Sequence, residues 1–364
     1  MSSPLSKIPS GVQYIFDEQA RLRRWIEREL MAVFEGWSYS EIILPIFDYA
    51  DLFALGMGKE QAELTYRFTG RDGKLLALRP EMTSLVARTV ATRFQNKPRP
   101  IRLCYSGEVF RWDEPRSGRQ YEFHQIGLEH IGSERLEADT EAIIIAVEAL
   151  RRIGLEHFTI TVGHVEFFNG IAESLALDET GRRQMQTMID RKESDELRSF
   201  LTAHAASHDV EGLCRVFSLS GGPEIIQEAK SRAASGRSIA ALDDLDRVYQ
   251  IAKALGLDRF VNVDLGEVGG LDYYTGLTFR IYAQGLGAAL GRGGRYDQFL
   301  AKFGQSEPAV GFSLCLDWLA ELLTRGGKKV NQRTEPTRIP ATDIVSAFKE
   351  AVRLRGEGMS VEIH

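Results

Sequence analysis

Hydrophobic and polar positions follow two different periods in the first third of the chain. Residues 18–39 carry apolar side chains at helical spacing, and the strand-like segment 41–49 follows, in which Pro45 suits an edge position. Residues 74–79 predict another strand. Pro80 then fits the first position of the next helix, because proline lacks an N–H that this position does not need. The chain is therefore expected to open with helices that alternate with short strands.

Two longer β-rich segments come next. Residues 101–111 and 121–132 flank a polar loop that contains proline and glycine, which is typical of an antiparallel hairpin. A helical pattern over residues 136–154 and a strand pattern over residues 158–164 follow this hairpin.

The pattern then changes character. Residues from about 171 to 255 are charged, helical in spacing and poor in β-branched side chains, which indicates a helical insertion. Strand patterns resume at residue 259 and recur at 277–283 and 309–315, the last continuing directly into a helical pattern. Antiparallel strands with flanking helices indicate an α+β core.

Composition narrows the class of protein. The 364 residues are 43% hydrophobic and 26% charged, which suits one large globular domain with attachments. No segment has the apolar length of a membrane helix, and the N-terminus lacks a signal-peptide pattern, so we expect a cytoplasmic protein that does not bind membranes. A net charge of −6 argues against a nucleic-acid backbone as partner.

Cysteine and histidine spacing does not indicate a metal or cofactor site. Cys104, Cys214 and Cys315 form neither a CxxC pair nor an even disulfide framework. His124 and His130 have no carboxylate or thiol at metal-ligand spacing on their own strand face. The glycine-rich segment 291–299 matches neither GxGxxG nor GxxxxGK[ST], so a nucleotide-binding loop of the usual kinds is not expected.

Candidate ligand contacts lie on the second strand of the hairpin. The period of two places Phe123, Gln125, Gly127, Glu129 and Ile131 on one face. This face offers an amide and a carboxylate on either side of a glycine, which leaves room for a ligand close to the backbone. The alternative is that both polar side chains point to water.

Other polar residues have a structural interpretation beside the functional one. Glu81 and Thr83 either contact a ligand or stabilise the start of a helix. Asp272 and Tyr274 either line a site or serve as a turn aspartate and a packed tyrosine. Arg111 is either a phosphate ligand or half of a surface salt bridge.

Five segments in order resemble histidyl-tRNA synthetase over roughly residues 8–325. They are LRPEMT (78–83), FRWDEPRSGRQYEFHQIGLE (110–129), LDYYTG (271–276), GGRYD (293–297) and AVGFSLCLDWL (309–319). The resemblance implies the class II synthetase fold, an antiparallel sheet flanked by helices. It also implies a dimer formed through residues 16–50, for which Trp25 and Trp37 are either interface anchors or part of the chain's own core.

The resemblance further implies a histidine pocket. The synthetases hold the amino group of histidine at positions that match Glu81, Thr83 and Gln125, and hold the imidazole at positions that match Glu129 and Tyr274. The full set of histidine-binding residues that we expect is Glu81, Thr83, Arg111, Gln125, Glu129, Tyr273, Tyr274 and Tyr296.

From the resemblance we expect neither the full set of catalytic arginines nor the tRNA-reading domain of the synthetases in this sequence. Three positions that hold arginine in that family are Gly269, Tyr121 and Trp318 here, which leaves Arg111 alone of the phosphate-handling set. Residues 326–364 are too few for an anticodon-binding domain and predict one helix and one strand appended to a core of residues 1–325.

This combination resembles the regulatory subunit of the short-form ATP phosphoribosyltransferase. The resemblance implies a non-catalytic subunit that joins a short catalytic subunit in a hetero-octamer, does not bind tRNA, and is needed for activity and for feedback inhibition by histidine in histidine biosynthesis. The alternatives are a truncated histidyl-tRNA synthetase and a paralogue that ligates an amino acid to another acceptor.

Overall fold

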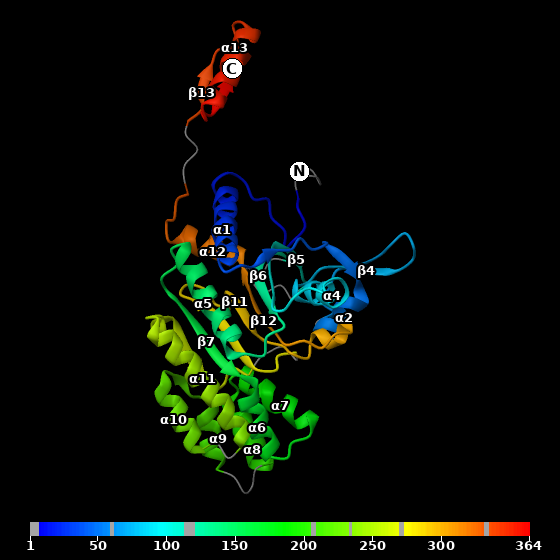
Figure 1. Cartoon of the computed structure of the whole chain (residues 1–364), viewed down its shortest axis with the longest axis vertical. Coiled ribbons are helices and arrows are strands. Elements are labelled where there is room, and N and C mark those ends of the chain that lie inside the picture. Colours follow the sequence, from blue (N-terminus) through cyan, green and yellow to red (C-terminus); the bar gives the residue numbers. More distant parts are fainter. Residues whose placement is uncertain are drawn as a thin grey trace.

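A nine-stranded mixed sheet forms the centre of the molecule (Figure 1). The computed structural model describes residues 7–58, 62–112, 121–204, 209–232, 235–268, 273–330 and 335–364. The strand order is β1-β5-β6-β12-β11-β10-β7-β9-β8. The bounds are β1 Ser40–Glu41, β5 Ile101–Phe110, β6 Glu122–Ile131, β7 Phe158–His164, β8 Ser220–Gly221, β9 Val261–Asp264, β10 Leu277–Ala283, β11 Gly291–Arg295 and β12 Ala309–Cys315.

Most neighbouring strands in this sheet are antiparallel, and the predicted α+β class is confirmed. The hairpin of β5 and β6 pairs Tyr105 with Gly127, and β12 continues the sheet by pairing Ser313 with Gly127. The pairs β1–β5 and β7–β9 are parallel. These two pairs make the sheet mixed. Parallel strands need a long crossover connection, and in both pairs such a connection lies between the two strands in sequence.

The sequence pattern assigned no secondary structure to residues 291–299, of which Gly291–Arg295 form strand β11. The strand lies between β12 and β10 in the middle of the sheet. A Cβ atom at Gly293 would approach the Gly311 carbonyl oxygen and the Phe279 ring to 2.5 Å each. The glycines therefore allow close packing at the centre of the sheet. Because glycine has a low strand propensity, the sequence pattern did not indicate a strand here.

Three helices cover one face of the sheet (Figure 1). They are α1 (Asp17–Gly36), α5 (Leu136–Arg152) and α12 (Leu316–Arg325). Ile126 and Leu128 of β6 are fully buried in the core beneath them. The predicted alternation along β6 is therefore confirmed, and it directs Gln125 and Glu129 to the opposite face.

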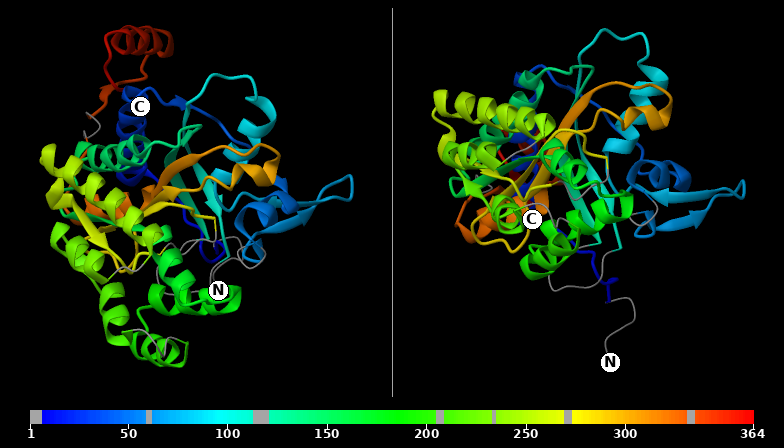
Figure 2. Two further views of the ribbon diagram at one scale, coloured as in Figure 1. Left: turned by 60° about the horizontal axis from the view of Figure 1, so that its bottom comes forward. Right: turned by 90° about the horizontal axis from the view of Figure 1, so that it is seen from below.

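The described residues between β7 and β9 form mainly helices, which make up the lower part of the molecule in Figure 1 and stack beside the sheet in both views of Figure 2. The helices are α6 Val165–Ser174, α7 Glu179–Asp190, α8 Ser194–His204, α9 Val210–Phe217, α10 Pro223–Arg232, α11 Gly236–Ala254 and the 3-10 turn η2 Asp258–Phe260.

A small antiparallel sheet with the strand order β2-β4-β3 lies beside the hairpin of β5 and β6. Its elements and neighbours are β2 Phe47–Tyr49, α2 Ala50–Met57, β3 Arg67–Thr69, β4 Leu75–Leu78, α4 Thr83–Arg93 and η3 Leu300–Phe303. The predicted strand 41–49 is thus two short strands that belong to different sheets, with residues 42–46 between them unpaired in either ladder.

The helix predicted to begin at Pro80 begins at Thr83 instead. Arg79 explains the delay, since its N–H donates to the Ile46 carbonyl and its guanidinium donates to the Leu44 carbonyl at 2.7 Å. The backbone is therefore held outside the helix until after Glu81. This shift places the Glu81 side chain ahead of the helix and at the sheet.

Trp25 and Trp37 pack against the chain's own core. The Trp37 indole donates to Glu148 of α5 at 2.8 Å, and the Lys328 ammonium lies 4.8 Å from the Trp25 ring. The interpretation of these residues as parts of the molecule's own packing is thus favoured over their use as interface anchors.

The last described residues form a small separate unit, drawn apart from the sheet in Figure 1. It consists of β13 (Thr337–Ile339), α13 (Ile344–Gly356) and β14 (Val361–Ile363), with β13 and β14 paired in parallel. The prediction of one helix and one strand missed β13, which is only three residues long. Among the described residues, no helix is long and apolar enough to cross a membrane.

Candidate functional site

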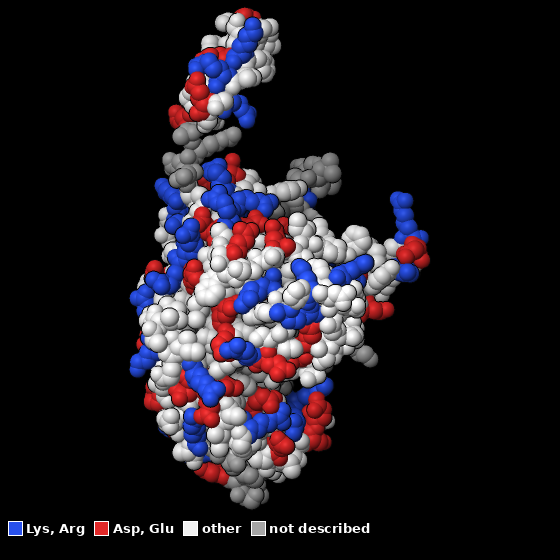
Figure 3. Space-filling model, viewed as in Figure 1, with Lys and Arg blue, Asp and Glu red and all other residues white. Residues whose placement is uncertain are grey.

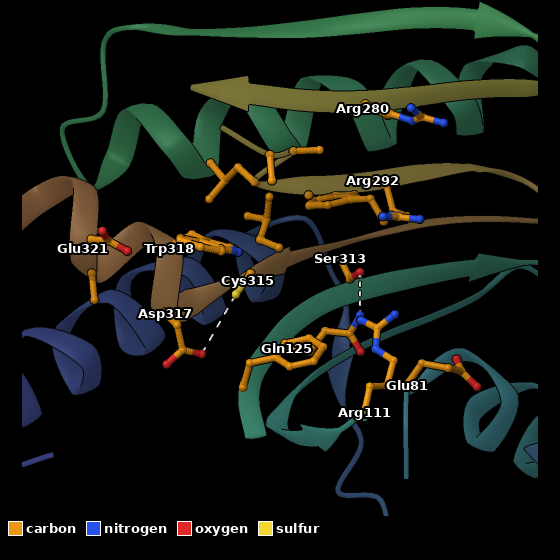
Figure 4. A pocket seen from close by; sticks show the side chains of 18 of the residues that line it. Glu81, Arg111, Gln125, Arg280, Arg292, Ser313, Cys315, Asp317, Trp318 and Glu321 are labelled. Carbon is orange, nitrogen blue, oxygen red and sulfur yellow. Dashed lines mark hydrogen bonds between the residues drawn. The ribbon is translucent and has the colours of Figure 1, made fainter. Parts of the chain in front are cut away.

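A cavity of about 970 Å³ opens over the middle strands of the central sheet (Figure 4). Its walls come from the hairpin, from β10, β11 and β12, and from α1, α4 and α12. Gly311 leaves one part of the floor without a side chain. A Cβ atom at Gly311 would lie 1.8 Å from a Glu129 oxygen, so only glycine leaves space for this carboxylate.

Glu129 is almost completely enclosed in the cavity, with 1% of its surface exposed. Its Oε1 accepts hydrogen bonds from the Thr83 hydroxyl at 2.8 Å and the Tyr105 hydroxyl at 3.2 Å, and its Oε2 accepts one from the Tyr296 hydroxyl. Burial raises the pKa of Glu129 to about 7 despite these bonds, and the nearby Glu81 charge adds to the rise. Glu129 therefore does not point to bulk water.

Glu81 supplies a second carboxylate. Both of its oxygens lie 3.1 Å from the Ser84 N–H of α4 and accept from it. Burial raises the pKa of Glu81, while the bonds from Ser84 and Thr83 and the positive charge of Arg111 oppose that rise. Two partly desolvated carboxyl groups in one cavity favour a ligand that is cationic or rich in N–H donors.

Gln125 adds an acceptor of hydrogen bonds. Its Nε2 donates to the Ser313 hydroxyl at 2.7 Å (Figure 4). Its Oε1 is buried and has no hydrogen-bond partner within the described ranges. A buried acceptor without a partner is costly, so this oxygen is suited to accept an N–H from a bound molecule.

Tyrosines form an aromatic wall around the two carboxylates. The ring of Tyr273 lies 4.8 Å from that of Tyr274 and 5.8 Å from that of Tyr296. Burial raises the pKa of Tyr274 to about 12 and that of the other two rings well above the usual value. The three phenols therefore stay protonated at neutral pH and are able to donate hydrogen bonds.

All eight residues that the sequence predicted for a histidine pocket line this cavity. Arg111 is among them, and its guanidinium lies 4.7 Å from the centre of the Phe123 ring, on which it stacks. Asp272, the remaining candidate of that segment, and Gly269 lie outside the described residues.

Among the arginines of the cavity that the sequence did not predict, Arg280 and Arg292 lie on neighbouring strands. They are direct partners in the antiparallel pair of β10 and β11, and Arg292 is also the partner of Ser313 on β12. The signal that was missed is the alternation within residues 291–295, which places Arg292 on the face of the cavity only once this segment is recognised as a strand.

Two positions that hold arginine in the synthetases carry neutral aromatic residues. Trp318 lines the cavity at the start of α12 (Figure 4). Tyr121 contacts the Tyr66 ring, with centroids 6.4 Å apart, and lies against Gly11. Neither side chain is able to neutralise a phosphate. Within the described part of the chain, no cluster of three potential metal ligands was found.

Comparison with known proteins agrees with this geometry. The sequence profile of histidyl-tRNA synthetase matches residues 11–319. The ATP phosphoribosyltransferase regulatory subunit of Moorella thermoacetica is 37% identical over 98% of this chain and 91% of that protein. The regulatory subunit of Geobacter sulfurreducens is 40% identical over 84% of this chain and 70% of that protein.

Solved structures show the same fold. The Bacillus halodurans protein described as an ATP phosphoribosyltransferase regulatory subunit/histidyl-tRNA synthetase superposes with a TM-score of 0.88 at 27% identity, over 100% of this chain and 93% of that one. Histidyl-tRNA synthetase from Nostoc gives 0.81 at 20% identity, over 98% and 85% respectively, which supports the fold alone. The chain therefore belongs to the ATP phosphoribosyltransferase regulatory subunit family, whose fold is that of histidyl-tRNA synthetase.

Proposed function

We propose that this chain is a non-catalytic subunit of a cytoplasmic ATP phosphoribosyltransferase and binds free histidine as an effector. In this role it joins a short catalytic subunit in a hetero-octamer, is needed for the activity of that subunit, and transmits feedback inhibition in histidine biosynthesis. The names of the relatives support the assignment to this enzyme. The cavity supports histidine as the ligand.

The observation that carries the proposal is the arrangement around Glu129 and Gln125. The Glu129 carboxylate, surrounded by three hydroxyl groups, is placed to accept an imidazole N–H. The partner-free Gln125 oxygen and the Glu81 carboxylate are placed to accept an ammonium group. An amino acid with a donor at each end satisfies all three acceptors, and histidine is such an amino acid.

The loss of cations supports a sensor rather than a ligase. Activation of a carboxylate by ATP needs positive charge on the phosphates in the transition state. Tyr121 and Trp318 stand at two of the arginine positions of the synthetases and bring none. We therefore expect the purified chain to show no histidine-dependent exchange of pyrophosphate into ATP and no charging of tRNA. Measurable exchange by the pure protein would favour the synthetase or ligase alternatives.

The decisive experiment uses the reconstituted complex with the catalytic subunit. Glu81→Ala and Glu129→Ala each remove one charge-assisted contact, which typically costs about 1.5 to 3 kcal/mol. We expect histidine to bind roughly ten- to a hundredfold more weakly, as measured by calorimetry. Phosphoribosyl-ATP synthesis should continue in both variant complexes, with the inhibition curve displaced to higher histidine concentration.

The matched control is Arg325→Gln, which alters a cavity residue of α12 that is paired with Glu321. This variant should keep the inhibition curve of the wild type. If inhibition is unchanged in both glutamate variants although histidine binds less tightly to the isolated chain, the inhibitory site lies on the catalytic subunit instead. Allosteric inhibition requires that histidine distinguish two states of the complex.

We also propose that the homodimer expected through residues 16–50 forms through the part of that region at residues 43–49, together with the small sheet. This surface exposes apolar side chains that a monomer would leave in water, in particular Ile43, with 89% of its surface exposed, and Phe47, with 52%. The remaining members are Ile46, Tyr49, Phe68 and Leu75. The ring centroids of Phe47 and Phe68 are 5.7 Å apart, so these two side chains form a continuous apolar surface.

The charges on the face shown in Figure 3 give no support to nucleic-acid binding. Lysine and arginine are interspersed with aspartate and glutamate over the face shown in Figure 3, and the net charge of the sequence is −6. A polyanion such as tRNA is bound most readily by a continuous basic surface. The proposed function therefore does not include tRNA.

A further inference from the structure

The carboxylate of the proposed amino-acid ligand has no assigned partner among the residues discussed so far. Glu81 and Gln125 face the ammonium end and Glu129 faces the side-chain end. Free histidine also carries a negative charge, and burying an unpaired carboxylate is costly. Arg111 stacks on Phe123, and its positive charge acts on the Glu81 carboxyl, which is itself an anion of the pocket.

The pairing of the strands brings a different cation, Arg292, close to the position expected for the ligand carboxylate. Arg292 pairs with Ser313 across β11 and β12, and the Ser313 hydroxyl accepts the hydrogen bond from Gln125. Neighbouring strands are about 4.8 Å apart, so the base of the Arg292 side chain lies one strand away from the Gln125–Ser313 contact. Figure 4 shows Arg292 and Arg111 on two sides of this contact.

The distance along the strands also fits one small molecule. Gly294, two residues beyond Arg292, pairs with Gly311, which in turn pairs with Glu129. Two residues along a strand span about 7 Å, which is on the length scale of an extended histidine from imidazole to carboxylate. A ligand with its imidazole at Glu129 therefore brings its carboxylate toward the row of Arg292.

The neighbours of Arg292 leave its charge available. Its cross-strand partner Arg280 is paired with Glu267 at 3.1 Å and with Asp190 of α7. Arg292 is exposed and has no hydrogen bond or salt bridge to any residue in the described ranges; its charge also acts on the carboxyl of Glu267, which is already paired with Arg280.

We propose that Arg292 binds the α-carboxylate of the amino-acid effector and so selects a free amino acid over analogues that lack this group. This inference rests on the proposed function, since it assigns the third group of the same ligand. The cavity then complements the whole zwitterion. Protein carboxylates contact the N–H donors of the ligand, and the Arg292 guanidinium contacts the ligand carboxylate.

The test compares L-histidine with L-histidinol, in which a neutral hydroxymethyl group replaces the carboxylate. Calorimetry is carried out on the wild-type chain, Arg292→Gln, Arg292→Lys and the control Arg325→Gln. We expect the wild type to prefer histidine by about ten- to a hundredfold. Arg292→Gln should lose most of this preference by weakening histidine alone, and Arg292→Lys should retain part of it.

The outcomes separate the inference from the proposed function. If the wild type binds neither compound, the proposed function fails and the inference with it. If Arg292→Gln keeps the wild-type preference, or weakens both compounds equally, Arg292 does not bind the carboxylate although the histidine pocket stands. Loss of the preference in Arg325→Gln as well would show a general charge effect and would also overturn the assignment.

Discussion

The substitution Glu129→Gln is predicted to stabilise the ligand-free protein at neutral and alkaline pH while it weakens histidine binding. Glu129 is 1% exposed, and the three hydroxyl groups around it only partly replace the water that its charged form loses. Glutamine keeps the size and shape of the side chain without a charge. The Glu129 carboxylate, which we propose to bind the ligand, is therefore expected to destabilise the ligand-free protein.

The size of the effect follows from the pKa. Burial raises the pKa of Glu129 from its usual 4.5 to about 7, and each pH unit of such a shift corresponds to about 1.4 kcal/mol. Between these two pH values the folded state holds a proton that the unfolded state has lost, so stability falls as pH rises through this window. The full penalty above pH 7 is about 3 kcal/mol.

The assay is urea unfolding of both proteins from pH 4.5 to 8, and the measured quantity is the difference in free energy of unfolding. Any effect of the glutamine amide on packing shifts this difference by a constant amount that does not depend on pH. The difference should therefore rise in favour of Glu129→Gln by up to about 3 kcal/mol across this range. The control is Glu134→Gln, an exposed residue in the loop before α5, for which a flat difference is expected. A flat profile for Glu129→Gln as well would refute a strongly raised pKa.

Two further predictions concern assembly and packing. The double variant Ile43→Asp with Phe47→Asp should sediment as a monomer at micromolar concentration, whereas Leu255→Asp, which alters an apolar residue with 56% exposure in the helical region, should leave the dimer intact; a dimer in all three proteins would move the interface elsewhere. Arg295→Met should lower the free energy of unfolding by about 3 to 5 kcal/mol, because it leaves Asp139 as a buried charge whose hydrogen bonds from Arg295, at 3.0 and 3.1 Å, are lost; a loss below about 1 kcal/mol in urea unfolding would show that this buried pair is dispensable.

The sequence by itself determined the elements that have a strong local signal. The hairpin of β5 and β6 and the helices α1, α5 and α12 follow from the periods of their apolar side chains, because those periods are set by backbone geometry alone. The same alternation placed Gln125 and Glu129 together on one face. The order of the short motifs then identified the fold and the expected pocket.

Only the tertiary structure decided which of those polar residues are buried and what they contact. Glu129 lies in a desolvated site because Thr83, Tyr105 and Tyr296 converge on it from separate parts of the chain. No local sequence pattern indicates that these three side chains contact Glu129. The choice between a pocket and a face in water therefore depended on contacts between residues far apart in sequence.

The arginines of the cavity show the same limit most clearly. Strand β11 is glycine-rich, and glycine has low strand propensity, so its place in the sheet comes from close packing against its neighbours. Without that strand, Arg292 has no defined face and Arg280 has no cross-strand partner. The sequence could list these charges but could not orient them, because their directions are set by the pairing of strands rather than by local preference.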